Sequence, residues 1–310
     1  MRKFKRIFIY ISAILTGTLL LVLILDANLF RGLFSKIQIY NISNTERSDK
    51  SSCLRTKTDV PFIICIFHTS QDIFISKSLL SSGIWEPKMT KLFQAVLQRN
   101  RNMTVIDIGA NIGYFSLLSA AFGHHVLSIE PVEENLLKFA NAVNLNNFHG
   151  KITVLRNVVS NTRGHLRLIL PSGNNQGAAR ILTEKEYKLN TNAISISSIV
   201  LDDLTQFIHT RDVMIKIDVE GHECRAIENS DVIFDTFRVK YVMTEWSKMT
   251  SEKYRYGVAC GPNNIKKMAE KLTQRGFIPY DVSNNQQLDP IDSMNWRYND
   301  IYWKHETLVS

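Results

Sequence analysis

Val-Ile-Asp-Ile-Gly-Ala-Asn-Ile-Gly, residues 105–113, is the stretch that decides the fold. An apolar run from Thr104 to Ile108 carries one acid, and an amphipathic stretch from Tyr114 to Phe122 follows the second glycine. This pattern predicts a buried strand, a tight glycine turn and the start of a helix. Glycine suits the turn because a side chain there would keep the backbone away from a ligand lying across it.

Two carboxylates beside this turn indicate a nucleoside-containing ligand. Asp107 lies inside the apolar strand, so its charge needs a partner such as a ligand ammonium or backbone N–H groups. Glu130 ends the next apolar run, His125–Ile129. It stands about 20 residues past Gly109, where a carboxylate is placed to accept from ribose hydroxyls. Without the two carboxylates, the glycine turn is also compatible with an ordinary strand–turn–helix whose glycines are only structural. This is the alternative to a ligand-binding turn.

The spacing favours S-adenosylmethionine over a nicotinamide cofactor. The dinucleotide pattern G-x-G-x-x-G is not met, because Asn111 occupies the position of its second glycine. A pyrophosphate also requires close approach to backbone amides at a helix start. An acid just before Gly109 suits a cationic ligand better. S-adenosylmethionine combines an amino acid moiety, a sulfonium and an adenosine, which fits D-x-G-x-x-x-G followed by a ribose acid.

Beyond the turn, expected strands and helices alternate. A helix over Glu133–Asn146 precedes a strand over Ile152–Leu155. The alternation predicts a doubly wound, mostly parallel α/β sheet with helices on both faces. Ligands of such sheets bind at the carboxyl ends of strands, where Asn157 also falls. Asn157 is a candidate for the adenine edge, or it caps a turn.

Other segments complete this expected architecture. Lys88–Arg99 has helical spacing, and Phe277–Val282 and Asn299–Trp303 are expected to form an antiparallel closing pair. Residues 158–200 interrupt the alternation and predict an inserted hairpin-like unit. The Gly- and Asn-rich loop over Pro171–Ala179 is either a lid or acceptor pocket, or a plain surface loop.

Residues 213–223, Val-Met-Ile-Lys-Ile-Asp-Val-Glu-Gly-His-Glu, form a second informative stretch. They predict a strand ending at Asp218, then a turn, then a helix. Asp218 and Glu220 should emerge beside the glycine turn, where they can orient a polar acceptor or take a hydroxyl proton. Glu223 is an alternative helix cap, and His222 a weaker candidate base. These oxygen and imidazole groups could ligate a metal, but they face different ways, so no protein-held metal is expected.

The amino terminus predicts a membrane anchor. Ile7–Leu25 is uncharged and approaches the roughly 20 residues that cross a bilayer as one helix. Basic residues precede it, so the positive-inside rule predicts a cytosolic tail and a lumenal domain. We therefore expect a single-pass type II membrane protein of the endoplasmic reticulum or Golgi. A cleaved signal peptide is the alternative, and an inverted topology would leave the domain cytosolic.

The expected organisation follows from this topology. It comprises a cytosolic tail (1–6), a transmembrane signal-anchor (7–25), a polar stem (26–60), a lead-in segment (61–100) and the catalytic domain (101–310). Lumenal topology makes Asn41-Ile42-Ser43 and Asn102-Met103-Thr104 glycosylation sequons. The second abuts the first core strand, which favours shielding.

Composition and cysteines exclude several classes of site. The net charge of +8 comes in part from the basic tail, and no arginine-rich block or aromatic platform indicates nucleic-acid binding. The 4 cysteines include no C-x-x-C, so zinc and redox motifs are not indicated. In an oxidising lumen Cys53 and Cys65 could pair, with buried free thiols as the alternative. The sequence does not indicate an oligomeric state.

At this point the chain resembles the FkbM-type methyltransferases, within the class I S-adenosylmethionine-dependent fold. The resemblance covers about residues 85–305. It is carried by Asp107–Gly113, Ser128–Pro131, Asn157–Ser160 with Gly164, Ile215–Glu223 and Glu245. Val158 departs mildly from the family, which often has alanine there.

The resemblance implies a seven-stranded sheet whose last strand is antiparallel. It implies acceptor-facing acids at Asp218 and Glu220, and methyl transfer to hydroxyl groups, often of sugars or secondary metabolites. The implied cofactor contacts are Asp107, Gly109, Asn111, Gly113, Glu130 and Asn157. Our hypothesis is S-adenosylmethionine-dependent O-methylation of a glycan, lipid or small metabolite. The alternative is a catalytically inactive, membrane-tethered binding module of the same fold.

Overall fold

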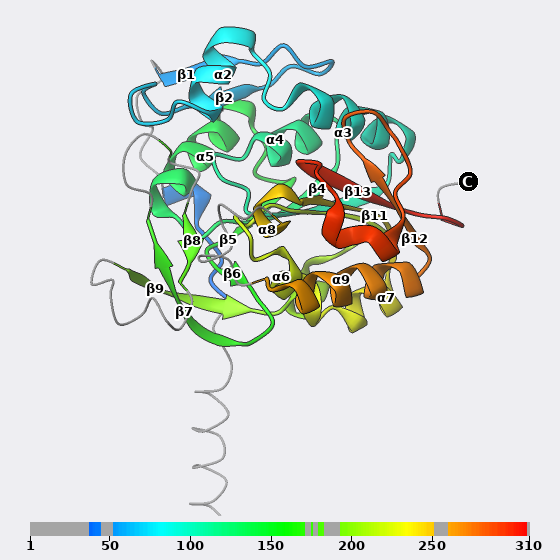
Figure 1. The fold of residues 1–310 in the computed structure, drawn as a ribbon. Coiled ribbons are helices and arrows are strands. Elements are labelled where there is room, and N and C mark those ends of the chain that lie inside the picture. Colours follow the sequence, from blue (N-terminus) through cyan, green and yellow to red (C-terminus); the bar gives the residue numbers. More distant parts are fainter. Residues whose placement is uncertain are drawn as a thin grey trace, which may run out of the picture.

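The computed structural model describes residues 37–44, 52–170, 175, 179–182, 193–250 and 260–308. The main sheet contains β3 (Met103–Ile108), β4 (His125–Ile129), β5 (Ile152–Leu155), β10 (Asp212–Ile217), β11 (Arg238–Glu245), β12 (Phe277–Asp281) and β13 (Asp300–His305). Its spatial order is β12-β13-β11-β10-β3-β4-β5 (Figure 1). Strand β13 runs antiparallel to both of its neighbours, β11 and β12, and the other neighbouring strands of the sheet are parallel to each other. The predicted seven-stranded, mostly parallel sheet is confirmed.

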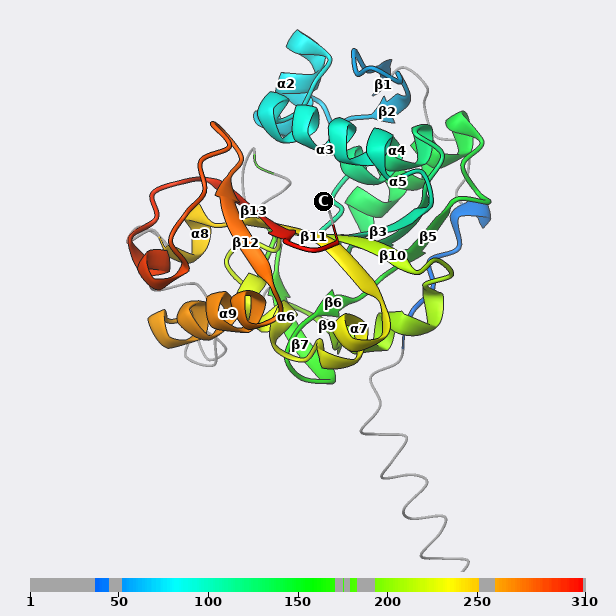
Figure 2. The same cartoon turned by 90° about the vertical axis from the view of Figure 1, so that its right-hand side faces the viewer.

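Helices cover both faces of this sheet. On one face lie α3 (Pro87–Arg99), α4 (Tyr114–Ala121) and α5 (Glu133–Asn146), and on the other lie α6 (Glu223–Glu228), α7 (Asp231–Thr236) and α9 (Pro262–Gln274) (Figure 2). Side chains of a strand alternate between the faces. Val105 of β3 accordingly packs in the core under α3–α5, whereas Ile106 and Ile108 pack in the core on the side of α9. Burial on both faces explains why the strand is apolar at nearly every position.

The amino-terminal residues are part of this domain. The hairpin of β1 (Cys53–Arg55) and β2 (Ile63–Cys65) lies over α5, followed by α2 (Ile75–Ser82). Ahead of it, Ile39 bridges to Leu155, so residues 37–40 extend the sheet beside β5. Residues expected in a free stem and a lead-in therefore belong to the folded domain, which begins well before residue 101.

Two disulfides are present. Cys53 and Cys65 are directly opposed across the β1–β2 pair and form a disulfide, which decides between the two alternatives left by the sequence. A second disulfide joins Cys224 in α6 to Cys260 ahead of α9. It ties the segment after β10 to the helix that precedes β12.

The inserted unit is a second sheet rather than a hairpin alone. Its strands are β6 (Val158–Val159), β7 (Gly164–Ile169), β8 (Arg180–Ile181) and β9 (Ile194–Ile199), in the order β6-β9-β7-β8. The predicted hairpin-like pairing holds for β7 and β9, which are antiparallel. Leu168, Ile196 and Val158 form its small core with Val132, at the carboxyl edge of the main sheet.

The predicted tail (1–6) and anchor (7–25) lie outside the described residues. No helix in the described ranges combines the length and apolarity needed to cross a membrane. Of the two sequons, Asn41 and Asn102 are both exposed. The expected shielding of Asn102 is wrong, because β3 begins one residue later and leaves that side chain outside the sheet.

Gly109 is required by the junction between β3 and β10. Its φ is +82°, and a Cβ built there would lie 1.8 Å from the Asp218 carbonyl oxygen. The Asp218 N–H donates to the Ile108 carbonyl across 2.9 Å, which holds the two strand ends together. A side chain at Gly109 would force these ends apart.

We expect Gly109→Ala to unfold more easily than Gly123→Ala. Gly123 also has a positive φ, +96°, but nothing lies within 4 Å of its added Cβ. Both variants carry the left-handed backbone cost of about 1–2 kcal/mol, and Gly109→Ala adds about 1–3 kcal/mol of overpacking. Urea denaturation of both variants measures the difference. Equal free energies of unfolding would show that the strand junction tolerates the methyl group.

Candidate active site

A cavity of about 530 Å³ opens at the carboxyl ends of β3, β4, β10 and β11. This volume lies within the range of small-molecule sites. The cavity is lined by most of the residues that the sequence predicted to bind the cofactor or to act on the acceptor, namely Asp107, Gly109, Asn111, Glu130, Asn157, Asp218 and Glu220. Leu168 and Ile181 of the inserted sheet close another wall. The two informative stretches of sequence therefore meet in one place.

Gly113 does not line this cavity. A Cβ added there would lie 2.1 Å from the ring of Phe139, a fully buried residue of α5. The second glycine of the turn thus serves helix packing, and the direct cofactor contact implied for it finds no support in its position.

Asp107 presents one carboxylate oxygen without a partner. Its Oδ2 accepts from Ser116 Oγ across 2.6 Å, while Oδ1 is buried and has no hydrogen-bond partner among the described residues. Burial raises the pKa of Asp107, and nearby Lys216 acts in the opposite direction. A buried acceptor at the cavity wall fits a ligand ammonium, as the sequence predicted.

Glu130 holds the glycine turn. Its Oε2 accepts from the Asn111 N–H across 2.8 Å, and its Oε1 accepts from Val132 N–H and Asn135 Nδ2 across 2.9 and 3.1 Å. Burial raises its pKa to about 7, although all three donors act in the opposite direction. The expected contact with ribose hydroxyls stays a prediction, for which Oε2, with one acceptor position in use, retains a further lone pair.

Asn157 has a structural role that explains its burial. Its Oδ1 accepts from Gln38 N–H across 2.9 Å, and its Nδ2 donates to the Ser197 carbonyl across 3.2 Å. The amide thus joins residue 38 and strand β9 at the cavity wall. Contact with an adenine edge stays a prediction.

Lys216 is the central cation of the site. Its Nζ lies 2.9 Å from Asp218 Oδ2 and 4.8 Å from the ring centroid of Phe115. Its register partner on β3 is Asp107. Burial lowers the pKa of Lys216, but the carboxylates of Asp218, Asp107 and Glu86 outweigh that effect and hold it above its ordinary value. The lysine therefore stays charged and joins the two strand ends.

Glu86 was not found by sequence reasoning. It precedes α3 with a φ of 43° and lines the cavity. Burial raises its pKa to about 8, with Lys216 acting in the opposite direction. No local pattern marks this acid, because its contact with the sheet depends on how α3 packs.

Asp218 and Glu220 both reach the cavity as members of ion pairs. Asp218 pairs with Lys216, and Glu220 Oε2 lies 2.6 Å from Lys248 Nζ. Their side chains keep 31% and 21% exposure. Burial raises the pKa of Glu220, and Lys248 acts against that effect. Both carboxylates are held in place and remain accessible to an acceptor.

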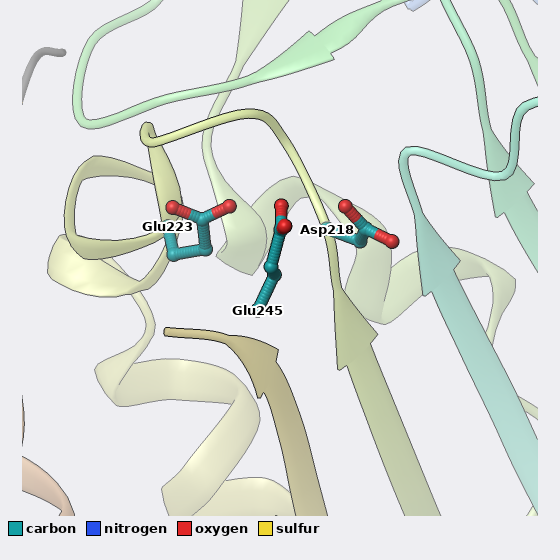
Figure 3. A group of neighbouring side chains, drawn as sticks. All are labelled: Asp218, Glu223 and Glu245. Atoms are coloured by element: carbon teal, nitrogen blue, oxygen red, sulfur yellow. The ribbon is translucent and has the colours of Figure 1, made fainter. Parts of the chain in front are cut away.

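Glu223 and Glu245 complete an acidic cluster beside Asp218. Glu223 is fully buried, and its Oε1 accepts from the N–H groups of Val219 and Gly221 across 3.0 and 3.3 Å, so it holds the turn ahead of α6 rather than capping the helix itself. Glu245 ends β11 and lines the cavity. Burial and the neighbouring Asp218 raise its pKa to about 11. Figure 3 shows Glu245 between the other two carboxylates.

His222 is excluded as the general base. It is buried and does not line the cavity, and its Nε2 lies 2.9 Å from Ser160 Oγ. Burial lowers its pKa to about 3. The sequence suggested an exposed histidine, whereas the turn at Gly221 directs it into the core.

We expect Lys216→Met to destabilise the fold by about 3–5 kcal/mol, because it leaves buried carboxylates without their cation. Adding Asp107→Asn should restore part of this loss, since the two residues are direct neighbours and their effects are not additive. Thermal and urea unfolding of the single and double variants measure the coupling. Simple additivity would show that Lys216 does not compensate Asp107.

Glu130 should make stability depend on pH. Its folded pKa of about 7 exceeds the ordinary 4.5, so it contributes stability that is complete below pH 4.5 and lost as the pH rises to about 7. Over that window one retained proton corresponds to about 1.4 kcal/mol per pH unit. In urea denaturation between pH 5 and 7, the free energy of unfolding of Glu130→Gln should fall less steeply with pH than that of the wild type, by about this slope. Parallel curves for the two proteins would contradict the raised pKa.

Several solved structures resemble the chain at low identity. Among solved structures, the chain is similar to an O-methyltransferase from Bacillus cereus in complex with SAH, at 12% identity, covering 71% of this chain and 81% of that chain, with a TM-score of 0.40. It is also similar to the N-terminal domain of human METTL16 in complex with SAH, at 12% identity, covering 70% of each chain, with a TM-score of 0.34. No curated protein matches the chain.

The match to a family model is the stronger finding. The model of the methyltransferase FkbM domain matches residues 107–279, from the acid of the glycine turn to β12. The match includes the cavity-lining ends of β3, β4, β10 and β11. The cofactor of this class is S-adenosylmethionine, and the unpartnered Asp107 Oδ1 suits its ammonium. The chain belongs to the FkbM family of S-adenosylmethionine-dependent methyltransferases.

Proposed function

We propose that the protein transfers a methyl group to a hydroxyl oxygen of a glycan, a lipid or a small hydroxylated metabolite. The observation that carries the proposal is one cavity that brings Asp218 and Glu220 beside the cofactor turn at Gly109. Carboxylates in that position are suited to hydroxyl acceptors, because they accept the hydroxyl hydrogen bond and can take its proton.

The cofactor side of the cavity is formed by Asp107 and Glu130. Asp107 Oδ1 would accept from the ammonium, and Glu130 would accept from ribose while it holds the Asn111 N–H. S-adenosylmethionine, when bound, supplies a methyl carbon whose bond to sulfur breaks as a bond to the acceptor oxygen forms. The residues of the chain contribute binding, alignment and acceptance of the hydroxyl proton.

The acceptor side of the cavity is formed by Asp218 and Glu220. Their ion pairs with Lys216 and Lys248 fix the carboxylates, so little side-chain ordering is left to the moment of reaction. Alignment of two reactants in this way is worth up to about 7–11 kcal/mol of the barrier. Leu168 and Ile181 limit the access of water from the side of the inserted sheet.

Lumenal placement behind an amino-terminal anchor is part of the proposal. Two disulfides are typical of an oxidising compartment, and the exposed Asn41 and Asn102 are available for glycosylation. An endoglycosidase should increase the gel mobility of the cell-expressed chain, and Asn41→Gln with Asn102→Gln should abolish the shift. An unshifted wild-type chain would place the domain on the cytosolic side or leave both sequons unused.

Cofactor binding is tested by calorimetry of the full-length chain with S-adenosylhomocysteine. Asp107→Ala and Glu130→Ala should each weaken binding by about 10- to 150-fold, the value of a lost charge-assisted hydrogen bond of 1.5–3 kcal/mol. Asp235→Ala is the control, because Asp235 is 69% exposed and pairs with Arg275 in its helix layer. Equal affinities for all four proteins would remove the proposed cofactor site.

Catalysis is tested with labelled S-adenosylmethionine and extracted glycans, lipids and small hydroxylated molecules. Asp218→Asn should lower kcat by about 10²–10⁴-fold, the usual contribution of a proton-accepting group, while S-adenosylhomocysteine affinity stays within a few-fold. Glu220→Gln tests the second carboxylate in the same way. Cofactor binding without transfer to any fraction would instead support the inactive binding module.

A further inference from the structure

We propose that Asp218, Glu223 and Glu245 form a divalent-cation site at the wall of the methyl-transfer cavity. One oxygen of each residue lies within 4.8 Å of the others (Figure 3). They come from three places that the fold brings together, namely the end of β10, the turn into α6 and the end of β11. The sequence analysis expected no protein-held metal, because it considered only the residues of one turn, which face different ways, and Glu245 was not among them.

Two buried oxygens in this cluster point to a ligand. Glu223 is 0% exposed, and its Oε2 has no hydrogen-bond partner among the described residues. Glu245 Oε2 is buried and likewise without a partner in that part of the chain. Native proteins rarely leave buried polar atoms unsatisfied, and a bound ion is one way in which such atoms are satisfied. Both residues belong to the cluster itself, so one ligand is placed to reach both carboxylates.

The spacing and the donor chemistry select the kind of ligand. Metal–oxygen distances of about 2.3–2.6 Å allow one ion to join oxygens up to about 5 Å apart. All donors are carboxylate oxygens, which suit Ca²⁺, Mn²⁺ and Mg²⁺ rather than soft or imidazole-preferring metals.

The nearby lysines leave the cluster short of positive charge. Lys216 is bound to Asp218 and also compensates Asp107, and Lys248 pairs with Glu220 while its charge also acts on Glu245. Glu223 has no ion pair in the described chain, and its contacts are backbone N–H groups. A divalent cation supplies the charge that three close carboxylates require.

The position of the site indicates what the cation does. Asp218 and Glu245 line the cavity, whereas Glu223 lies behind them. Three protein ligands leave coordination positions open on the cavity side for oxygens of an acceptor. On the basis of the proposed function, we infer an acceptor that offers two neighbouring hydroxyl oxygens, as sugars do. The ion would orient these oxygens and lower the pKa of the one to be methylated.

The site is tested with Mn²⁺ and the chelator-treated full-length chain. Calorimetry or the loss of the free Mn²⁺ electron paramagnetic resonance signal should show one ion per chain. Glu223→Gln and Glu245→Gln should each weaken binding by at least about tenfold, because each removes a charged ligand. Glu228→Gln is the matched control, since Glu228 ends the same helix, pairs with Arg225 and is 47% exposed. Its affinity should equal that of the wild type.

A second readout protects the test against variants that merely misfold. Bound Mn²⁺ should raise the melting temperature of the wild type and of Glu228→Gln, in proportion to RT ln(1 + [L]/Kd), and leave Glu245→Gln unchanged. Circular dichroism confirms that the variants fold. No Mn²⁺ binding by the wild type, or equal binding by Glu223→Gln, would overturn the site.

The outcome also separates this inference from the proposed function. Methyl transfer that proceeds unchanged in a chelator would overturn the role of the cation and leave the methyltransferase intact. Mn²⁺ binding with the predicted variant pattern, but without methyl transfer to any acceptor fraction, would support the ion site and count against the proposed reaction.

Discussion

The contact between the ends of β3 and β10 is the constraint on which the rest of the site depends. Only glycine fits at position 109, because the Asp218 carbonyl occupies the space of a side chain. This contact fixes the register that puts Lys216 beside Asp107. It therefore brings a cofactor-facing acid and an acceptor-facing acid to the same buried cation. Strand pairing, charge compensation and site geometry are consequences of one close approach.

The backbone architecture was largely predictable from local patterns. The bounds predicted for β4, α5 and β5 equal those observed, because each segment combines a clear apolar period with polar or glycine boundaries. The number of strands and the antiparallel last strand followed from the family resemblance rather than from periodicity. Short elements such as α7 and the 3-10 helix Leu201–Phe207 were missed. They contain too few turns for a periodic signal, and tertiary contacts decide their conformation.

The candidate site was predictable only in part. Acids at strand ends are recognisable in the sequence, since a charge inside an apolar run is costly without a partner. Partners contributed by other elements give no such signal, and for that reason Glu86 and Lys248 were not anticipated. His222 shows the reverse error, and Gly113, whose cofactor contact stays a prediction, is likewise set by packing. Each stands within a functional motif, but a packing requirement determines its direction. Motif membership identifies the neighbourhood of a residue, and its role depends on the fold around it.

The strand-like pairing of residues 37–40 beside β5 also bears on the proposed membrane anchor. If residues 7–25 anchor the chain, residues 26–36 alone separate the bilayer from the folded domain. Even a fully extended segment of that length reaches only about 40 Å, at about 3.3–3.6 Å per residue. Such a short connection confines the cavity to a thin layer above the lipid surface. Acceptors would then be met by lateral diffusion, or near the membrane, rather than throughout the bulk of the compartment.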